Sequence, residues 1–147
     1  MRRYALPVAV IGGTLVAVAA ASILVDRSAL PAEDLDIGDR AACDLLTGAD
    51  LRALGFGDVL PDAHDDFCAW SAGPLRASPL MVSLDRFDEY GEFAERVNGP
   101  RLAGYPAARH PGLIAVAYAD PGVFTVVGED DSVTTDAAAR ILTTLRT

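Results

Sequence analysis

The longest hydrophobic segment of the chain runs from residue 4 to residue 25 and contains no charged side chain. Arg2 and Arg3 precede it. As a helix, about 22 residues extend roughly 33 Å, which is about the thickness of the hydrocarbon core of a bilayer. The pattern therefore predicts a signal-anchor transmembrane helix over residues 1–25. The arginine pair favours a cytoplasmic N-terminus and an extracytoplasmic C-terminal part.

A cleavable secretion signal is the alternative interpretation of this segment. Small residues such as Ala19 and Ala21 fit a signal-peptidase site, and cleavage there would make the protein secreted. The apolar character continues to Val25, beyond the roughly 7–15 residues usual in a signal peptide, which favours a retained anchor. Small residues also recur every four positions, a spacing that permits weak homo-association in the membrane but arises easily by chance in an alanine-rich segment: Ala9, Gly13, Ala17 and Ala21.

The pattern after the apolar run changes to short periodic segments. Residues 26–41 mix proline, glycine and acids without a sustained apolar period, which predicts an extracytoplasmic spacer. We expect the folded domain to begin near Ala42. Thr47 and Asp50 have the spacing of a capping box, so they predict a short helix that Gly55 ends.

Alternating hydrophobic and polar positions predict strands in the rest of the chain. Residues 58–66 are too polar for this pattern and are interpreted as a loop. The expected strands cover residues 67–72, 80–84, 104–110, 113–119 and 123–128. The last two are expected to form a hairpin through the turn at residues 120–122.

Helical spacing of hydrophobic residues appears in two further places. It occurs over residues 87–97 and after Thr135, which with Asp136 is expected to cap the last helix. The stripe of that helix is Ala138, Ile141, Leu142 and Leu145. The whole pattern predicts a single α+β extracytoplasmic domain over residues 42–147, with a small antiparallel sheet of about five strands and two or three helices, preceded by the transmembrane helix.

The charge of the chain lies almost entirely after the apolar run. Ten arginines and 21 acids follow residue 25, which leaves this part with a net charge of −11. Such a charge opposes binding to nucleic acid and favours an envelope protein partner with a basic surface, bound in a salt-sensitive way. The candidate acidic interaction surface consists of Asp65, Asp66, Asp130 and Asp131. The alternative is that the charge only keeps an exported domain soluble.

The chain contains two cysteines, Cys43 and Cys68. In an oxidising exterior, an even pair in a small domain predicts one disulfide. The alternative, a nucleophilic Cys68 activated by His64, requires a free thiol in that compartment and lacks a residue to orient the histidine.

No motif in the sequence indicates catalysis, a metal or a cofactor. The acidic loops lack the spacing of a calcium-binding loop, and a phosphate-binding loop is excluded because the chain has no lysine. We therefore interpret the protein as a membrane-tethered extracytoplasmic binding or interaction module of the cell envelope, without enzymatic activity. The alternatives are a purely structural envelope protein and a small envelope hydrolase that uses Asp85 and Glu89 as a carboxylate pair.

Three segments of the chain are similar to a known family. They are CDLLTGADLRALGFG, then CAW after an acidic loop, and GYPAAR before two valine-rich strands. In this order they resemble the domain of unknown function 3558 family, small actinobacterial envelope proteins that are mostly lipoproteins. The resemblance covers about residues 42–146. It implies an envelope location and a disulfide-tied α+β domain, and it implies no catalytic residues.

Overall fold

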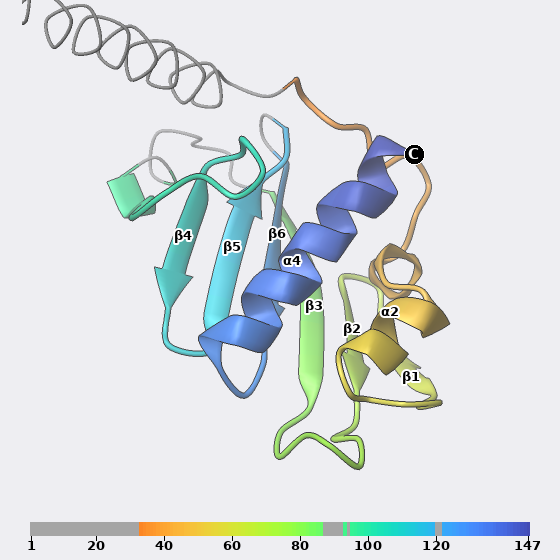
Figure 1. Cartoon of the computed structure of the whole chain (residues 1–147). Coiled ribbons are helices and arrows are strands. Elements are labelled where there is room, and N and C mark those ends of the chain that lie inside the picture. Colours follow the sequence, from red (N-terminus) through yellow and green to blue (C-terminus); the bar gives the residue numbers. More distant parts are fainter. Residues whose placement is uncertain (1–32, 87–92, 94, 120–121) are drawn as a thin grey trace, which may run out of the picture. The chain divides into compact units, whose positions relative to one another are not determined.

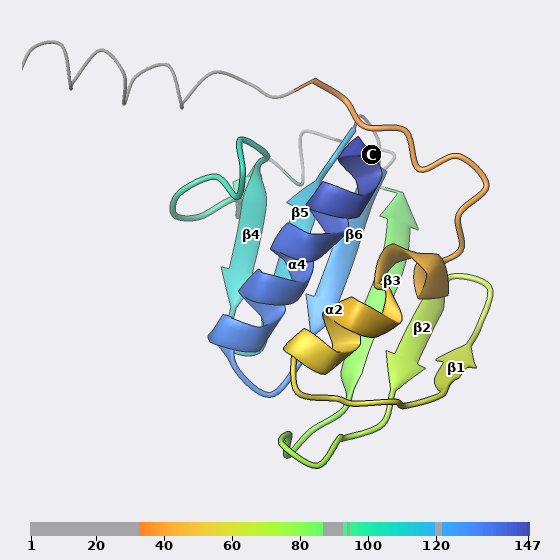
Figure 2. The ribbon, with the colours of Figure 1, turned by 45° about the vertical axis from the view of Figure 1, so that its right-hand side comes forward.

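The computed structural model of the chain describes residues 33–86, 93, 95–119 and 122–147. These residues belong to a compact unit, Ala32–Thr147. Its centre is a six-stranded antiparallel sheet with the strand order β1-β2-β3-β6-β5-β4 (Figure 1). One long helix, α4 (Asp131–Arg146), lies over one face of this sheet, and the short helices η1 (Ala42–Leu45) and α2 (Gly48–Ala53) lie beside it (Figure 2).

The strands are β1 (Pro61–Ala63), β2 (Phe67–Trp70), β3 (Leu80–Arg86), β4 (Ala107–His110), β5 (Leu113–Ala117) and β6 (Gly122–Val127). Strands β3 and β6 form the centre and pair in register from Met81 opposite Val127 to Arg86 opposite Gly122. The five strands predicted from hydrophobic alternation therefore all contain a strand of the sheet. The sixth, β1, lies in the segment that was interpreted as a polar loop, and all three of its residues are exposed.

The predicted fold class is wrong. Instead of about five strands with two or three helices behind a transmembrane helix, the described residues form six strands and one main helix. Within these residues, no helix has the length and apolar character needed to cross a membrane. The transmembrane helix expected over residues 1–25 lies outside the described part of the chain, and so does most of the helix expected over residues 87–97.

The capping box predicted at the first helix is confirmed. The Thr47 hydroxyl accepts a hydrogen bond from the backbone N–H of Asp50 at 3.2 Å, and the Asp50 carboxylate accepts one from the backbone N–H of Thr47 at 2.9 Å. These two bonds satisfy N–H groups that a helix start leaves without partners. Gly55, with φ of +89°, adopts the left-handed conformation after the helix, as predicted.

The last helix begins earlier than predicted. Asp130 is its N-cap, and its carboxylate accepts a hydrogen bond from the backbone N–H of Val133 at 2.8 Å. The cap predicted at Thr135 is therefore wrong, because Thr135 lies inside the first turns of α4. The predicted apolar stripe is confirmed, since Ile141 and Leu142 are fully buried against the sheet.

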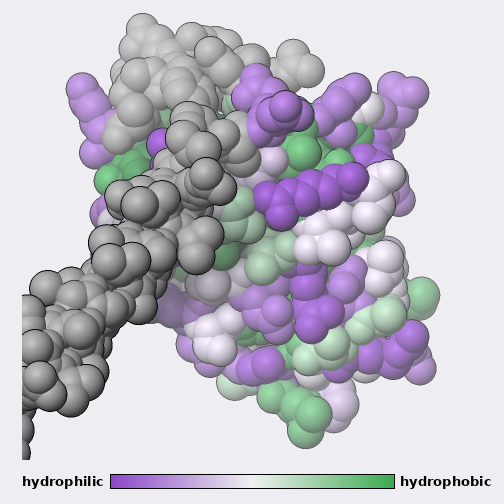
Figure 3. All heavy atoms as spheres, turned by 45° about the horizontal axis from the view of Figure 1, so that its top comes forward, coloured by the Kyte–Doolittle hydropathy of each residue, from purple (hydrophilic) through white to green (hydrophobic). Residues whose placement is uncertain are grey.

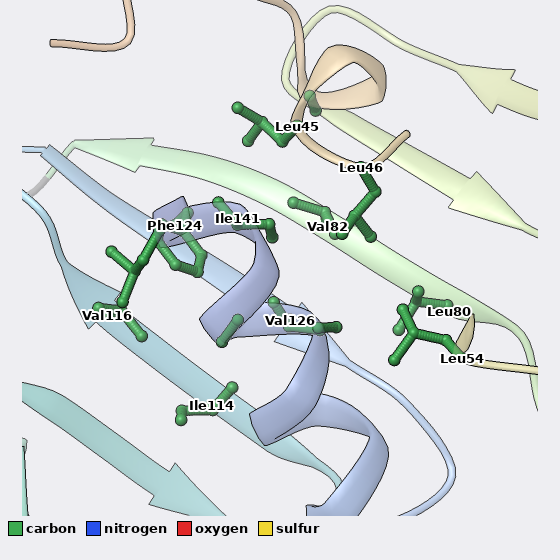
Figure 4. Packing of buried hydrophobic residues seen from close by; sticks show 14 of the residues in the cluster. Leu45, Leu46, Leu54, Leu80, Val82, Ile114, Val116, Phe124, Val126 and Ile141 are labelled. Atoms are coloured by element: carbon green, nitrogen blue, oxygen red, sulfur yellow. The ribbon is translucent and has the colours of Figure 1, made fainter. Parts of the chain in front are cut away.

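The main core lies between the sheet and the helices (Figure 4). Val82, Val126 and Phe124 project from the two central strands, and all three are fully buried. Ile141 from α4 packs over them, while Leu45 covers the side nearer to β2 (Figure 4). A continuous apolar layer of this kind stabilises the domain in proportion to the area removed from water.

The disulfide between Cys43 and Cys68 is confirmed. It joins η1 to β2, and Cys68 is fully buried on the core side of the sheet. The segment that leads into η1 also packs on the domain. The backbone N–H of Leu35 donates a hydrogen bond to the carbonyl of Tyr118 at 2.8 Å, and the Tyr105 hydroxyl donates one to the carbonyl of Glu33 at 2.9 Å. The compact unit therefore includes much of the segment that was expected to be a spacer.

The two edges of the sheet are poorly suited to pairing with another strand. At β4, Asn98 accepts a hydrogen bond from the backbone N–H of Arg109 at 2.7 Å and donates one to its carbonyl at 3.1 Å. These contacts occupy backbone groups that an edge strand otherwise leaves free. At the other edge, β1 is three residues long and begins with Pro61, which has no N–H to donate.

Candidate functional site

The four acids of the predicted interaction surface do not lie together. Asp66 is at the beginning of β2, where its carbonyl accepts a hydrogen bond from the backbone N–H of Leu84 near the end of β3. Asp130 follows β6, whose last residue, Val127, pairs with Met81 near the beginning of β3. Because β3 runs from one end of the sheet to the other, the pair Asp65 and Asp66 lies at the opposite end from Asp130 and Asp131 (Figure 2).

The acids before α4 are bound by the protein itself. Asp130 caps the helix, and Asp131 accepts a hydrogen bond from the backbone N–H of Gly112 at 2.9 Å. Glu129 lies 2.7 Å from an Arg76 guanidinium nitrogen and accepts a second bond, also 2.7 Å, from the backbone N–H of Ala77. A hollow of about 430 Å³ at this end is lined by these acids. Since their oxygens already hold the loop in place, this end serves the fold.

Two carboxylates in such contacts have altered acidity. The hydrogen bond from Arg76, together with that from Ala77, holds the pKa of Glu129 below its usual value of 4.5. Partial burial by itself raises the pKa of Asp50. Hydrogen bonds from Thr47 and the ion pair with Arg140 at 3.2 Å outweigh that effect and hold this pKa below its usual value of 3.8.

The free energy of unfolding is therefore expected to decrease as the pH falls below about 4. Because both folded-state pKa values are lowered, the unfolded chain binds protons first, and the stabilisation that is present above the usual values is lost as the pH falls through the lowered ones. Urea unfolding at pH 7, 4 and 3 measures this change. In the variant Asp50→Asn/Glu129→Gln the decrease should be smaller, whereas Asp58→Asn, at an exposed ion pair, should keep it. Equal decreases in all three proteins would contradict the prediction.

A pocket of about 500 Å³ lies at the end of the sheet that carries Asp65 and Asp66. Four parts of the chain line it: the segment before η1, the turn between β1 and β2, the end of β3 and the residue that follows β5. The lining residues are Ile37, Gly38, Arg40, Asp65, Asp66, Leu84 and Tyr118. Figure 3 brings this end of the sheet forward and shows hydrophilic residues interspersed with hydrophobic ones.

A tight turn positions the residues before η1. The Asp36 carboxylate accepts a hydrogen bond from the backbone N–H of Gly38 at 2.8 Å, and Gly38 has φ of +60°, a conformation that suits glycine. The backbone N–H of Arg40 donates to the carbonyl of Ile37 at 3.3 Å, and the Ile37 side chain packs against the core. The turn thus places Arg40 at the pocket, on a backbone held by the hydrogen bond to Ile37 and by the packing of Ile37 against the core.

The aromatic wall of the pocket is also held in place. The Tyr118 ring lies against Gly122 so closely that a Cβ there would be 2.5 Å from its Cζ atom. It also stacks on Phe124, with ring centroids 6.0 Å apart. Tyr118 is only 9% exposed, so it forms a rigid wall of the pocket.

The turn between β1 and β2 carries the two carboxylates. The His64 ring stacks on Phe67, with centroids 4.2 Å apart, and its Nε2 atom is 3.2 Å from the Asp62 carboxylate. Asp65 and Asp66 follow and are exposed. The disulfide lies just beyond both sides of the pocket, since Cys43 comes three residues after Arg40 and Cys68 two residues after Asp66. It therefore fixes the arginine side relative to the carboxylate side.

The electrostatics of this pocket differ from those at the other end of the sheet. No hydrogen bond or ion pair within the described part of the chain involves the carboxylates of Asp65 and Asp66 or the guanidinium of Arg40. The pocket thus offers two anionic groups and one cationic group that pair with no other described residue.

Sequence reasoning missed Arg40 and Tyr118. Arg40 was assigned to the spacer and Tyr118 to the sheet, and neither stands in a recognisable motif. One local signal was present, because the sequence Asp36-Ile37-Gly38 is typical of a turn closed by an aspartate side chain. Four residues, Asp39 to Ala42, separate this turn from Cys43 along the chain, and Arg40 is one of them. The disulfide therefore marks where the turn docks.

The described residues give no evidence for a metal site or for the carboxylate pair of a hydrolase. Among them, no group of three His, Cys, Asp or Glu side chains is placed to hold a metal ion. Glu89 and the side chain of Asp85, the candidate carboxylate pair of a hydrolase, lie outside the described part of the structure. Comparisons of the chain with protein-family models, with curated proteins and with solved structures find no match. The resemblance to the domain of unknown function 3558 family therefore stays a prediction.

Proposed function

We propose that the protein is a membrane-tethered extracytoplasmic interaction module of the cell envelope. Its binding site is the pocket beside Asp65 and Asp66, and its partner is an envelope protein that presents a basic group. The observation that carries this proposal is the pair of exposed carboxylates that line a pocket and that no described residue neutralises.

Two features support a location outside the cytoplasm. The uncharged segment over residues 4–25, with Arg2 and Arg3 before it, has the pattern of a segment that directs export. The disulfide between Cys43 and Cys68 is of a kind that persists in oxidising compartments and is rare in the cytosol.

Cell fractionation tests the location. We expect the intact protein in the membrane fraction, with residues 40–147 accessible to a protease added from outside. A mature form that begins between Ala20 and Asp26 and is free in the medium would instead show that the apolar segment is removed as a secretion signal. Intact protein in the cytosol would contradict an extracytoplasmic role.

The charge of the domain supports a basic partner. The net charge of −11 after residue 25 attracts a cationic surface and increases the rate of encounter with it. Salt weakens this attraction, because the Debye length falls from roughly 10 Å at 0.1 M to about 3 Å at 1 M. Binding through the exposed carboxylates should therefore decrease as salt is added.

The variant Asp65→Asn/Asp66→Asn is expected to lose the salt-sensitive partner without a change in melting temperature. Both side chains are exposed, and neither carboxylate makes a hydrogen bond or ion pair with a described residue. Their neutralisation therefore removes the attraction for a basic partner and leaves the packing of the domain intact. The measurement is crosslinking capture from membranes at low and high salt, with thermal unfolding in parallel.

The matched control is Asp130→Asn/Asp131→Asn, which removes the same charge at the other end of the sheet. It should keep the partner. If both variants capture the same partners as the unmodified protein, the charge serves solubility only, and the proposed interaction site is wrong. Equal losses in both variants would point to the overall charge and would likewise contradict a site at the pocket.

A further inference from the structure

Arg40 differs from the other arginines of the domain. Each of the others whose side chain the structure describes has a partner: Arg52, Arg76, Arg96, Arg101, Arg109, Arg140 and Arg146. Arg40 is half-buried and lines the pocket, and its guanidinium makes no hydrogen bond or ion pair with another described residue. In a domain with so many more acids than bases, a cation without a carboxylate partner is held available for an anionic group from outside the chain.

From this arrangement we propose that the pocket binds an α-amino acid zwitterion, either as a free amino acid or as the end of a larger molecule. The ligand carboxylate pairs with the Arg40 guanidinium, and the ligand ammonium pairs with Asp65 and Asp66. This inference rests on the proposed function in one respect, because the ligand ammonium is a basic group bound by Asp65 and Asp66. It goes beyond that function in giving Arg40 a ligand carboxylate to bind.

The charges of the pocket discriminate between ligand classes. A ligand with only a positive charge is repelled by the Arg40 guanidinium. A ligand with only a negative charge is repelled by the carboxylates of Asp65 and Asp66 and by the negative field of the whole domain. A zwitterion satisfies both signs and brings no net charge. A planar guanidinium is well suited to the carboxylate end, because it can donate two parallel hydrogen bonds.

The rest of the lining suits an aliphatic side chain. Ile37, Leu84 and Tyr118 supply apolar surface to the same pocket. The volume of about 500 Å³ lies within the range of roughly 300–1,000 Å³ that is usual for small-molecule sites. The turn at Gly38, the disulfide and the packed Tyr118 ring hold the walls before a ligand arrives, which lowers the ordering cost of binding.

Three probes of similar shape test this inference on the purified full-length protein. They are L-leucine, isoamylamine, which lacks the carboxylate, and 4-methylvalerate, which lacks the amine. Isothermal titration calorimetry should show that leucine binds at least about tenfold more tightly than either of the other two, because each lacks one charge-assisted contact. If isoamylamine binds as well as leucine, the zwitterion inference is wrong while the proposed basic partner stands. If no probe binds, the inference is also wrong.

Variants of Arg40 then test the assignment of the ligand carboxylate. Arg40→Gln should weaken leucine binding at least about tenfold and leave isoamylamine binding equal or tighter, and Arg40→Lys should restore part of the loss. The matched control Arg52→Gln removes the same charge from an exposed ion pair and should bind leucine as the unmodified protein does. Unchanged leucine binding in Arg40→Gln, with melting temperatures equal, would overturn the assignment of the carboxylate.

A fourth probe separates the two sources of the zwitterion. Nε-acetyllysine carries the same α-amino and α-carboxyl groups at the end of a longer molecule. Binding equal to that of leucine supports a site that takes the end of a larger molecule. Binding at least about tenfold weaker supports a site closed around a free amino acid.

Discussion

The variant Cys43→Ala/Cys68→Ala is expected to lower the free energy of unfolding by about 3.5 kcal/mol. Without the disulfide the unfolded chain regains the conformational entropy that the closed loop had removed from it. The two cysteines are 25 residues apart in the sequence. Small domains have total stabilities of roughly 5–15 kcal/mol, so the loss is a large part of the whole. The measurement is urea unfolding of the variant beside the unmodified protein.

Reduction of the unmodified protein provides the control. With reductant present, its unfolding midpoint should approach that of the double variant, whose own midpoint should not change. Without reductant, native protein should take up no thiol reagent. If the variant unfolds at the same denaturant concentration as the oxidised protein, the disulfide does not stabilise the fold.

The variant Phe124→Ala is expected to lower the free energy of unfolding by about 3–5 kcal/mol, which is the usual cost of removing a fully buried aromatic ring. Phe124 is 0% exposed, lies on a central strand and packs with Val116 and Ile141 in the core (Figure 4). The ring also stacks on Tyr118, so its loss removes support from the wall of the pocket.

Leu60→Ala is the matched control for this core substitution. Leu60 is 87% exposed, so its truncation should change the free energy of unfolding by no more than about 0.5 kcal/mol. Both values come from denaturant unfolding with the slope compared between variants. A loss below about 1 kcal/mol in Phe124→Ala would show that the described core does not carry the stability of the domain.

The position of the pocket at the Asp65 and Asp66 end of the sheet depends on the disulfide and not on the acids before α4. The acids before α4 cap a helix, bind a neighbouring loop and pair with Arg76, so the fold uses them. The acids before β2 have no such role. The bridge between Cys43 and Cys68 holds their turn beside the segment that carries Arg40, and this explains how two stretches far from the middle of the sheet form one pocket.

Features that depend on neighbouring residues were predictable from the sequence. The capping box of Thr47 and Asp50 needs only a spacing of three residues, and the turn at Gly55 needs only the freedom of glycine. Strands with strict alternation, such as the one around Val82, were predictable because the period of a strand is a local property. The disulfide followed from the presence of only two cysteines and an expected oxidising location.

Features that depend on contacts between distant segments were decided by the tertiary structure. Strand β1 is short, polar and exposed, and it forms because β2 offers it backbone partners. Helix α4 begins at Asp131 and not after Thr135: Asp130 caps it, and Asp131 also bonds Gly112 from another hairpin. No local pattern contains the partner of β1 or the bond to Gly112. The Asp130 cap is local, three residues before Val133, and the sequence analysis missed it by choosing Thr135.

The candidate site shows the same division. The sequence by itself determined which residues carry charge, and it indicated that Asp65, Asp66, Asp130 and Asp131 lie in two loops. Only the tertiary structure decided that these loops are at opposite ends of the sheet, because the direction of each strand depends on its pairing. It likewise decided that Arg40 lines the same pocket as the first pair of acids. That juxtaposition arises from chain packing and a covalent bridge over 25 residues, neither of which a periodic pattern encodes.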